Sequence, residues 1–272
     1  MVRRRPSRGR GGAAPPVLPR APAAVGAVSR RDAAGRAAVA GLGAWAVFAV
    51  VGVVAAGGGG APLPVDRGLL SWSLGHRPEV ALAAARGLTA TGTGAVPYAL
   101  VVLAGVLLGR TPRLRALAAG LGVVCLAVGQ MARYGLMELA ARPRPPRLDW
   151  ATAASGWSFP SGHTTTSALT AGLLIAATLL RGPRGRTALC VVAGCWGALV
   201  GLTRVYLGVH WFTDVIGGWL YAAGWLAVCL YAAVRWLPSD VLDGLSEAGA
   251  TAGEPPGGAE RSYSGRRERP PA

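Results

Sequence analysis

The sequence predicts an all-α protein, a six-span transmembrane helix bundle with a short extracytoplasmic helical or loop region after the first span. Of its 272 residues, 52% are apolar and only 15% are charged, which is a low charged fraction for a soluble domain. The apolar residues also gather in blocks of about 20, the length that a helix needs to cross a bilayer. These observations indicate a polytopic membrane protein and exclude an ordinary soluble domain.

Six apolar segments are expected to cross the membrane. A glycine-rich break at residues 57–60 follows the first span, and Pro97 is expected to kink the second. The mixed stretch 65–90 is expected to form a short helix that lies at the interface or folds over the outer face. The predicted spans are 37–56, 88–109, 114–139, 162–180, 187–205 and 211–236.

Residues 1–36 and 237–272 form two tails around the membrane domain 37–236, and both tails are expected to be disordered because they are rich in proline, glycine and arginine. The net charge is +16, and arginine carries all of the positive charge because the chain has no lysine. A basic tail can bind nucleic acid. The interpretation favoured here is contact with anionic lipid, so the expected partner is the bilayer, without nucleic acid, and the oligomeric state is left open.

The placement of arginine predicts the orientation in a plasma membrane. Both tails and the connections at 110–115 and 181–186 are rich in arginine, and the positive-inside rule makes that side cytoplasmic. The remaining connections then face outward. Arg142, Arg144 and Arg147 lie in one of these outward connections, against the charge rule, which favours a function for them.

Three polar clusters fall on this predicted outward side. Arg142-Pro143-Arg144-Pro145 follows the third span, the string 160–163 opens the fourth, and Thr203-Arg204 with His210 and Asp214 bridges the fifth and sixth. Because the spans bring all three clusters to the same membrane face, we expect them to form one site.

The residue types in these clusters suit phosphate chemistry. His210 and Asp214 are four residues apart and share a face if the helix has begun. A carboxylate on one imidazole nitrogen leaves the other nitrogen as a nucleophile. Ser161 and Gly162 at a helix start are expected to offer free backbone N–H groups to phosphate oxygens, with His163 at the rim. The alternative is a plain helix start that Ser161 caps.

Arginines supply the positive charge that a phosphoryl group needs. Arg144 and Arg204 are expected to bind phosphoryl oxygens, because guanidinium groups bind them bidentately and stay charged. Arg133 lies deeper, within the third span. It either contributes to the site or forms a salt bridge with Glu138 or extends toward the membrane surface.

These residues resemble the type-2 phosphatidic acid phosphatase family, the superfamily of lipid phosphatases and vanadium haloperoxidases, in its bacterial membrane-bound form. The family pattern is Lys-x6-Arg-Pro, then Pro-Ser-Gly-His, then Ser-Arg-x5-His-x3-Asp. The chain matches it at Arg144-Pro145, at 160–163, and at Arg204, His210 and Asp214, with Thr203 in place of serine. The family's lysine position is Met137. Arg133, one helical turn earlier, and Arg142 are the candidates to replace it.

The resemblance implies a phosphoric-ester or diphosphate hydrolase that needs no metal or other cofactor and acts on a membrane lipid phosphate. His210 would form a phosphohistidine, Asp214 would orient it, and His163 would protonate the leaving group and then activate water. The phosphate-binding set is Arg144, Arg204, Ser161 and Gly162, with Arg142 and Arg133 as further candidates.

The substrate class and the reaction type stay open at this point. Undecaprenyl-type diphosphate, phosphatidate and phosphatidylglycerophosphate all fit a site at the outer edge of the bilayer. Trp157, Phe159 and Trp211 flank the histidines and suit the interfacial layer. A lipid phosphotransferase with the same intermediate is one alternative, and a catalytically weakened lipid-binding or transport protein is another.

Overall fold

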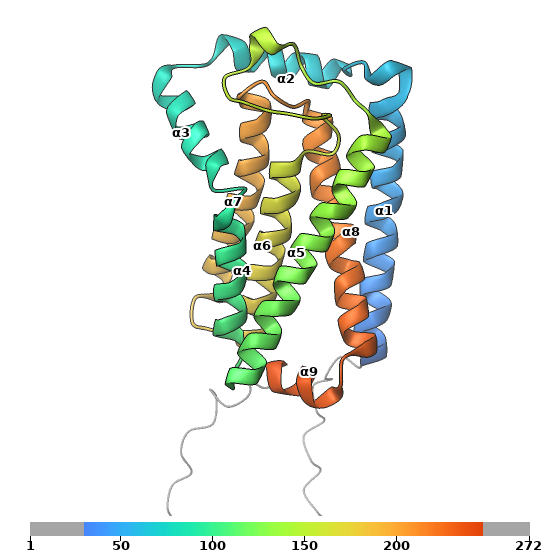
Figure 1. Ribbon diagram of the computed structural model, residues 1–272, viewed down its shortest axis with the longest axis vertical. Helices are drawn as coiled ribbons and strands as arrows, with labels where there is room; N and C mark the ends of the chain where they lie inside the picture. The colour runs from blue at the N-terminus through green and yellow to red at the C-terminus, as the bar shows by residue number, and fades with distance from the viewer. Residues whose placement is uncertain (1–29, 247–272) are drawn as a thin grey trace, which may run out of the picture.

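The computed structural model describes residues 30–246, and this part of the chain is an all-helical bundle, which confirms the predicted fold class. The disorder expected for 1–29 and 247–272 concerns residues outside the described ones. Five helices are long and apolar enough to span a membrane, and a bent pair of shorter helices makes a sixth candidate. The five are α1 (Arg30–Gly60), α5 (Pro112–Ala140), α6 (Gly162–Arg181), α7 (Arg186–Tyr206) and α8 (Phe212–Trp236), which run along the length of the bundle (Figure 1).

The glycine-rich break after the first span is present where the sequence predicts it. Gly57 is extended, with a ψ of 158°, and Gly58 and Gly59 have φ values of 58° and 73°, which glycine adopts without strain. The stretch 65–90 forms two helices rather than one short helix, α2 (Pro64–Gly75) and α3 (Glu79–Ala90). Helix α2 lies across one end of the bundle (Figure 1), and we call this the α2 end.

The expected kink at Pro97 is wrong. The second span is broken between α3 and α4 (Ala95–Leu108), which are bent by 53°. Gly94 makes this turn, with φ 68° and ψ −141°, a conformation that suits only glycine. Pro97 lies in the first turn of α4, where a backbone N–H has no intrahelical acceptor, so proline does not disturb the helix there.

Both ends of the membrane domain extend beyond the predicted boundaries. Helix α1 begins at Arg30, within the stretch assigned to the N-terminal tail, and α9 (Ser239–Ser246) lies in the stretch assigned to the C-terminal tail. The Arg30 guanidinium donates to the carbonyls of Val234 at 2.9 Å and Leu237 at 2.7 Å. The last carbonyls of α8 lack intrahelical partners, so Arg30 caps the end of α8. These hydrogen bonds also hold the first residue of α1 against α8.

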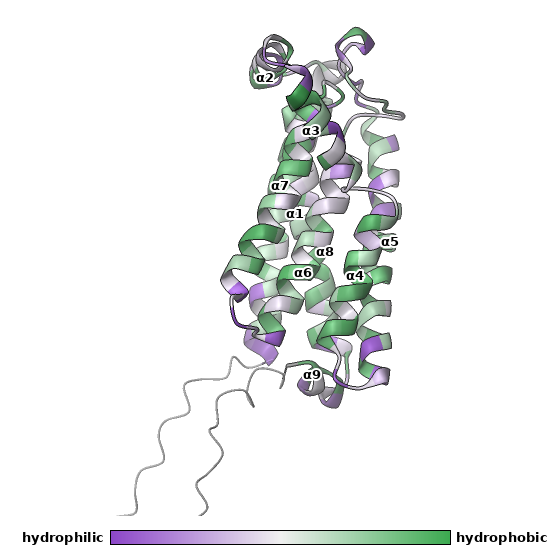
Figure 2. Cartoon of the chain, turned by 90° about the vertical axis from the view of Figure 1, so that its left-hand side faces the viewer, coloured by the Kyte–Doolittle hydropathy of each residue, from purple (hydrophilic) through white to green (hydrophobic). Residues whose placement is uncertain are grey.

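Small residues bring α6, α7 and α8 close together. A Cβ atom on Gly201 of α7 or on Gly218 of α8 would lie 3.0 or 2.9 Å from the side chain of Thr164 in α6. Glycine at such contacts lets membrane helices approach closely. Hydrophobic residues predominate along the helices, while hydrophilic ones gather near the ends (Figure 2). The packing places the start of α6 between α7 and α8, at the α2 end.

Candidate functional site

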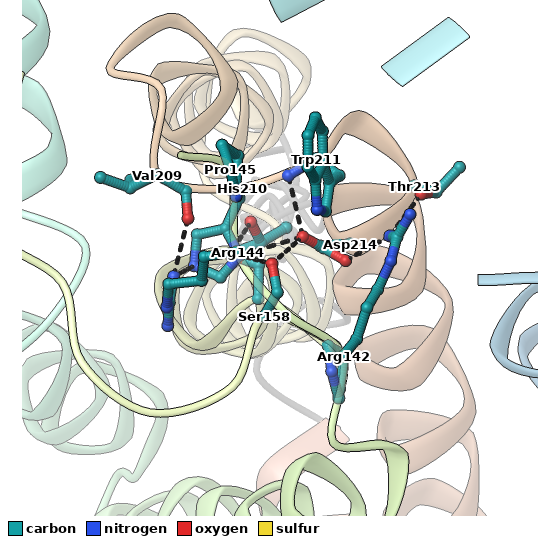
Figure 3. A network of polar contacts seen from close by, with 12 residues as sticks. Arg142, Arg144, Pro145, Ser158, Val209, His210, Trp211, Thr213 and Asp214 are labelled. Carbon is teal, nitrogen blue, oxygen red and sulfur yellow. Dashed lines mark hydrogen bonds and ion pairs between the residues drawn. The ribbon is translucent and has the colours of Figure 1, made fainter. Parts of the chain in front are cut away.

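The three polar clusters converge at the α2 end of the bundle. Arg144 Nη1 lies 2.8 Å from His210 Nε2, and the Ser161 backbone N–H donates to the Asp214 carbonyl at 3.1 Å. His163 interacts electrostatically with Arg204, His210 and Arg144. Figure 3 shows the centre of this cluster, with the His210, Arg144 and Asp214 side chains directed toward one another. The convergence predicted from the spans is therefore present.

His210 lies in the loop before α8 rather than on the helix itself, because α8 begins only at Phe212. The expected helical face is absent, yet His210 Nδ1 lies 3.4 Å from Asp214 Oδ2. The backbone N–H groups of Val209 and His210 donate to the Arg204 carbonyl at 3.1 and 3.3 Å. The loop thus extends from the end of α7 and presents the imidazole to the first turn of α8.

The contacts of His210 determine its tautomer. Guanidinium groups only donate hydrogen bonds, so Arg144 Nη1 requires that His210 Nε2 accept. The ring proton is then on Nδ1, facing Asp214. Burial lowers the pKa of His210 to about 4, and Asp214 opposes this shift while the charge of Arg144 adds to it. At neutral pH the ring is uncharged, with the Nε2 lone pair available to attack an electrophile.

Asp214 is fully buried in the first turn of α8, where the helix dipole favours a carboxylate. Its Oδ2 atom accepts from the Trp211 backbone N–H at 2.8 Å and from the Ser158 hydroxyl. Ser158 Oγ also lies 3.5 Å from His210 Nδ1. Sequence reasoning missed Ser158, because a serine in an irregular loop carries no signal that distinguishes it.

Arg142 contacts Asp214 on the side of the carboxylate opposite to His210. Its Nη1 donates to Asp214 Oδ1 at 2.6 Å and to Thr213 Oγ1 at 2.7 Å, and its Nη2 donates to Asp66 Oδ2 at 2.8 Å. The Arg142 side chain has no exposed surface. Both terminal amino groups are committed to protein acceptors, which contradicts the expectation that Arg142 binds phosphate oxygens.

Ser161 is the N-cap residue of α6, but its backbone N–H is not free as expected, because it donates to the Asp214 carbonyl. The Ser161 hydroxyl accepts from Thr164 Oγ1 at 2.9 Å, and Ser161 is fully buried. Gly162 and His163 supply the first N–H groups inside α6, where a helix has no acceptor of its own for them. The N–H groups at the helix start that lack an intrahelical acceptor are therefore those from Gly162 and His163 onward, not that of Ser161.

Arg133 reaches the start of α6 from α5. Its guanidinium carbon lies 3.3 Å from the position of a Cβ atom built on Gly162, so Arg133 packs closely against this glycine. Its Nε donates to Gln130 Oε1 at 3.1 Å and its Nη1 to the Pro160 carbonyl at 3.5 Å. Glu138, the alternative partner, instead accepts from Trp157 Nε1 at 3.1 Å. Arg133 thus belongs to the cluster.

Two threonines from the α3–α4 region contact the site, and sequence reasoning did not find them. Thr89 Oγ1 accepts from Arg204 Nη1 at 2.9 Å, and Thr93 Oγ1 lies 3.4 Å from His163 Nε2. Arg204 is only 2% exposed, and its buried Nε–H has no partner among the described residues. The break between α3 and α4 therefore forms one wall of the site.

Arg144 is held in place by backbone carbonyls. It donates to the carbonyls of Gly156 at 2.9 Å, Val209 at 2.8 Å, Ser155 at 2.7 Å and Trp157 at 2.9 Å. Burial lowers the pKa of Arg144 from its ordinary value, but an arginine stays charged at neutral pH. The positive charge beside His210 Nε2 is thus fixed in position.

Of the three aromatic residues expected at the membrane interface, only one has an exposed ring. Trp157 is 40% exposed, whereas Phe159 and Trp211 are 2% and 6% exposed. Phe159 stacks on Phe48 with ring centroids 5.5 Å apart, and Trp211 Nε1 donates to the Pro143 carbonyl at 2.9 Å. The interfacial assignment is therefore wrong for Phe159 and Trp211, which are buried in the protein and support the site.

Comparison with known proteins shows which proteins the chain is similar to. The profile of the PAP2 superfamily matches residues 117–237. Phosphatidylglycerophosphatase B of Bacillus subtilis (strain 168) is 38% identical over 88 residues, which are 30% of this chain and 42% of that protein. Undecaprenyl-diphosphatase of Sulfolobus acidocaldarius is 31% identical over 113 residues, which are 39% of this chain and 48% of that protein. The chain thus spans less than half the length of these relatives.

A solved structure shows the same fold. The crystal structure of a transmembrane PAP2 type phosphatidylglycerolphosphate phosphatase from Bacillus subtilis matches with a TM-score of 0.59 and 22% identity. The match covers 72% of this chain and 94% of that one. Arg133, Arg144, His163, Arg204 and Asp214 all lie within the region of the family match. The chain therefore carries, at residues 117–237, a domain that is similar to the PAP2 superfamily.

Proposed function

We propose that the protein is an integral-membrane lipid phosphatase, which hydrolyses a phosphomonoester or diphosphate headgroup at the outer membrane face through a phosphohistidine intermediate. The observation that carries this proposal is the state of His210. Its proton faces Asp214, its Nε2 lone pair faces the cluster of cations, and its imidazole is neutral at pH 7. A buried, oriented and uncharged imidazole with guanidinium groups nearby is suited to attack a phosphoryl group.

The first step forms the covalent intermediate. His210 Nε2 attacks phosphorus in line with the bridging oxygen, so the P–N bond forms as the P–O bond breaks. His163, protonated while it faces the anionic phosphoryl group, gives its proton to the departing oxygen, which leaves as the alcohol or phosphate product. Asp214 accepts the Nδ1–H hydrogen bond and balances the charge of the imidazolium ring as the ring loses its neutrality.

The second step releases phosphate. His163, now neutral, takes a proton from water, and the water oxygen attacks phosphorus. The P–N bond breaks, its electron pair returns to His210 Nε2, and inorganic phosphate forms. One histidine thus serves as acid in the first step and as base in the second.

Cations stabilise the negative charge that grows on the phosphoryl oxygens. Arg144, Arg204 and Arg133 all interact electrostatically with His163, and the N–H groups of Gly162 and His163 add a helix N-terminus. The Arg144 Nη1 donor now contacts the lone pair of His210 Nε2. When the substrate binds, phosphorus lies beside His210 Nε2, and Arg144 Nη1 donates its hydrogen bond to a phosphoryl oxygen instead.

The substrate class follows from the relatives and from the membrane setting. Relatives that match this chain are named phosphatidylglycerophosphatase B, undecaprenyl-diphosphatase and lipid A 1-phosphatase. All three names refer to phosphorylated lipids. The arginine-rich connections lie at the end of the bundle away from the site, so the positive-inside rule supports an outward-facing site.

The test uses purified full-length protein and a panel of phosphatidate, phosphatidylglycerophosphate and undecaprenyl diphosphate, with a chelator present. We expect phosphate release from at least one lipid without added metal, inhibition by vanadate, and no turnover in His210→Asn. The matched control is His76→Asn, because His76 is exposed and its imidazole contacts Trp72, through the Trp72 carbonyl and by stacking on its ring, rather than a residue of the site. Label from the lipid that appeared on a second lipid rather than in inorganic phosphate would identify a phosphotransferase instead.

A further inference from the structure

Asp66 is a completely buried carboxylate on α2, outside the region of the family match, and the reaction described above does not use it. Its oxygens accept hydrogen bonds from the Thr213 backbone N–H at 2.9 Å and from the Thr213 hydroxyl at 2.9 and 3.0 Å. The Leu63 backbone N–H donates to it at 3.1 Å. Asp66 therefore links α2 to the first turn of α8.

The remaining partner of Asp66 is Arg142. Arg142 Nη2 lies 2.8 Å from Asp66 Oδ2, and Arg142 Nη1 lies 2.6 Å from Asp214 Oδ1. All three side chains have no exposed surface. One guanidinium group thus bridges two carboxylates inside the protein, where water does not weaken the interaction.

This bridge fixes the rotation of the Asp214 carboxylate. Because Oδ1 is held by Arg142, Oδ2 is left to face His210 Nδ1, the Ser158 hydroxyl and the Trp211 N–H. Asp66 in turn keeps the Arg142 guanidinium in the plane that allows this contact. Asp66 also neutralises part of the positive charge of Arg142. The Asp214 carboxylate therefore interacts more strongly with the His210 imidazolium.

We propose that Asp66 is a positioning residue for phosphoryl transfer, which acts through Arg142 and Asp214 to orient and support His210. The inference rests on the proposed function, because it assigns Asp66 a part in the formation of the phosphohistidine. It also gives α2 a role in the reaction: the helix across the end of the bundle carries the outermost member of the network Asp66–Arg142–Asp214–His210.

Asp66→Asn tests the proposal, because it keeps the shape of the side chain and removes its charge. In full-length protein in detergent, we expect kcat to fall by about 10- to 100-fold with KM nearly unchanged, as for loss of a hydrogen bond between charged groups. The acid limb of kcat/KM should move to lower pH, since an imidazolium with less carboxylate support forms less readily. The matched control is Asp149→Asn, an aspartate at the same end of the bundle outside this network, with expected wild-type kinetics.

A purely structural role for Asp66 gives a different result. Thr213→Val removes the hydroxyl that donates to Asp66 and accepts from Arg142 Nη1, but keeps all charges of the network. If Asp66 only anchors α2, Thr213→Val and Asp66→Asn will lower the thermal stability alike and leave kcat per folded molecule unchanged, which overturns the proposal.

Arg142→Lys covers the case in which Asp66→Asn does not accumulate as folded protein. A lysine keeps the charge but cannot bridge both carboxylates, so the same selective loss of kcat is expected, and an unchanged kcat refutes the proposal. Wild-type protein that hydrolyses no lipid of the panel refutes the proposed function and this inference together. An active wild type with a fully active Asp66→Asn variant refutes the inference alone.

Discussion

The fold determines the protonation state of His210. Burial lowers the pKa of His210 to about 4, well below the ordinary value of 6.5, and the adjacent charge of Arg144 contributes to this shift. The neutral form is the nucleophile. A group with a lowered pKa loses its neutral form only as the pH falls toward that pKa, so the ring stays reactive throughout the physiological range.

The pH dependence of kcat/KM follows from this shift. We expect the acid limb that belongs to His210 to lie near pH 4 rather than near 6.5. Arg144→Gln removes a cation beside Nε2, so the pKa of His210 rises and the acid limb moves to higher pH, together with a lower maximal rate. A pH series on wild type and Arg144→Gln with a short-chain lipid phosphate measures both. An acid limb near 6.5 that Arg144→Gln does not move would contradict the assignment.

Arg133 and Met137 allow a direct test of the missing lysine. The two residues are four apart on one face of α5, and Arg133 Nη1 lies 3.4 Å from Met137 Sδ. We expect Arg133→Gln to lower kcat by about 100-fold, as for removal of one charge-stabilising donor. Adding Met137→Lys to Arg133→Gln should restore part of this loss, because it returns a cation to the position where the family has its lysine.

Met137→Lys alone should keep or raise the activity of the wild type. If the double variant is no more active than Arg133→Gln, Arg133 does not stand in for the lysine. Steady-state phosphate release, corrected for the amount of folded protein, is the measurement for all three variants.

The sequence singles out most ionisable residues of the cluster, with Asp66 the exception, but few of its hydroxyl-bearing residues. His163, His210, Asp214 and Arg204 are rare or costly residue types at the ends of apolar spans, so each stands out on its own. Serine and threonine are common in helices and loops alike. Ser158, Thr89 and Thr93 become visible only when the fold brings them to a histidine, an aspartate or an arginine.

At the scale of elements, the break between α3 and α4 is the feature that completes the site. Thr93 in the break lies beside His163, and Thr89 in the last turn of α3 accepts from Arg204. Gly92 lies within the break, and a Cβ atom there would lie 2.3 Å from Val200 Cγ1 in α7. The break thus packs directly on α7, and its distance from α7 sets the position of both threonines.

Gly92→Ala should push this break away from α7. We expect kcat to fall by about 10- to 100-fold, since small displacements of catalytic contacts have effects of this size. Val200→Ala in the same chain frees the space and should restore much of the activity. Gly87→Ala is the control, because a Cβ atom at Gly87 in α3 meets nothing within 4 Å. Equal activity of Gly92→Ala and Gly87→Ala would show that the break does not position the site.

The spans were predictable because each apolar block is long enough for a bilayer, and observed helices such as α6 (Gly162–Arg181) and α7 (Arg186–Tyr206) agree with the predicted spans within one residue at each end. The bend in the second span was misplaced. Proline is the usual sign of a kink, but here the bend depends on the positive φ of Gly94, and glycine is too common in this chain to mark it.

At the scale of the whole molecule, the orientation in the membrane is the testable claim. Leu148, at the α2 end, is fully exposed, and Arg184 is exposed in the connection between α6 and α7. We expect Leu148→Cys to react with a membrane-impermeant maleimide in intact cells, and Arg184→Cys to react only after permeabilisation. The unmodified chain, whose four cysteines all lie in helices that are candidates for membrane spans, serves as the background. The reverse labelling pattern would place the site in the cytoplasm.

The central claim is that His210 carries the phosphoryl group, and trapping that group tests it most directly. A phosphoester with a good leaving group needs no proton from His163, but release of the intermediate needs His163 to activate water. His163→Ala incubated with p-nitrophenyl phosphate should therefore accumulate an acid-labile phosphate on the peptide that contains His210, as measured by mass spectrometry. His163→Ala combined with His210→Asn should carry none. Phosphate on another residue, or p-nitrophenol release that persists in the double variant, would contradict the account.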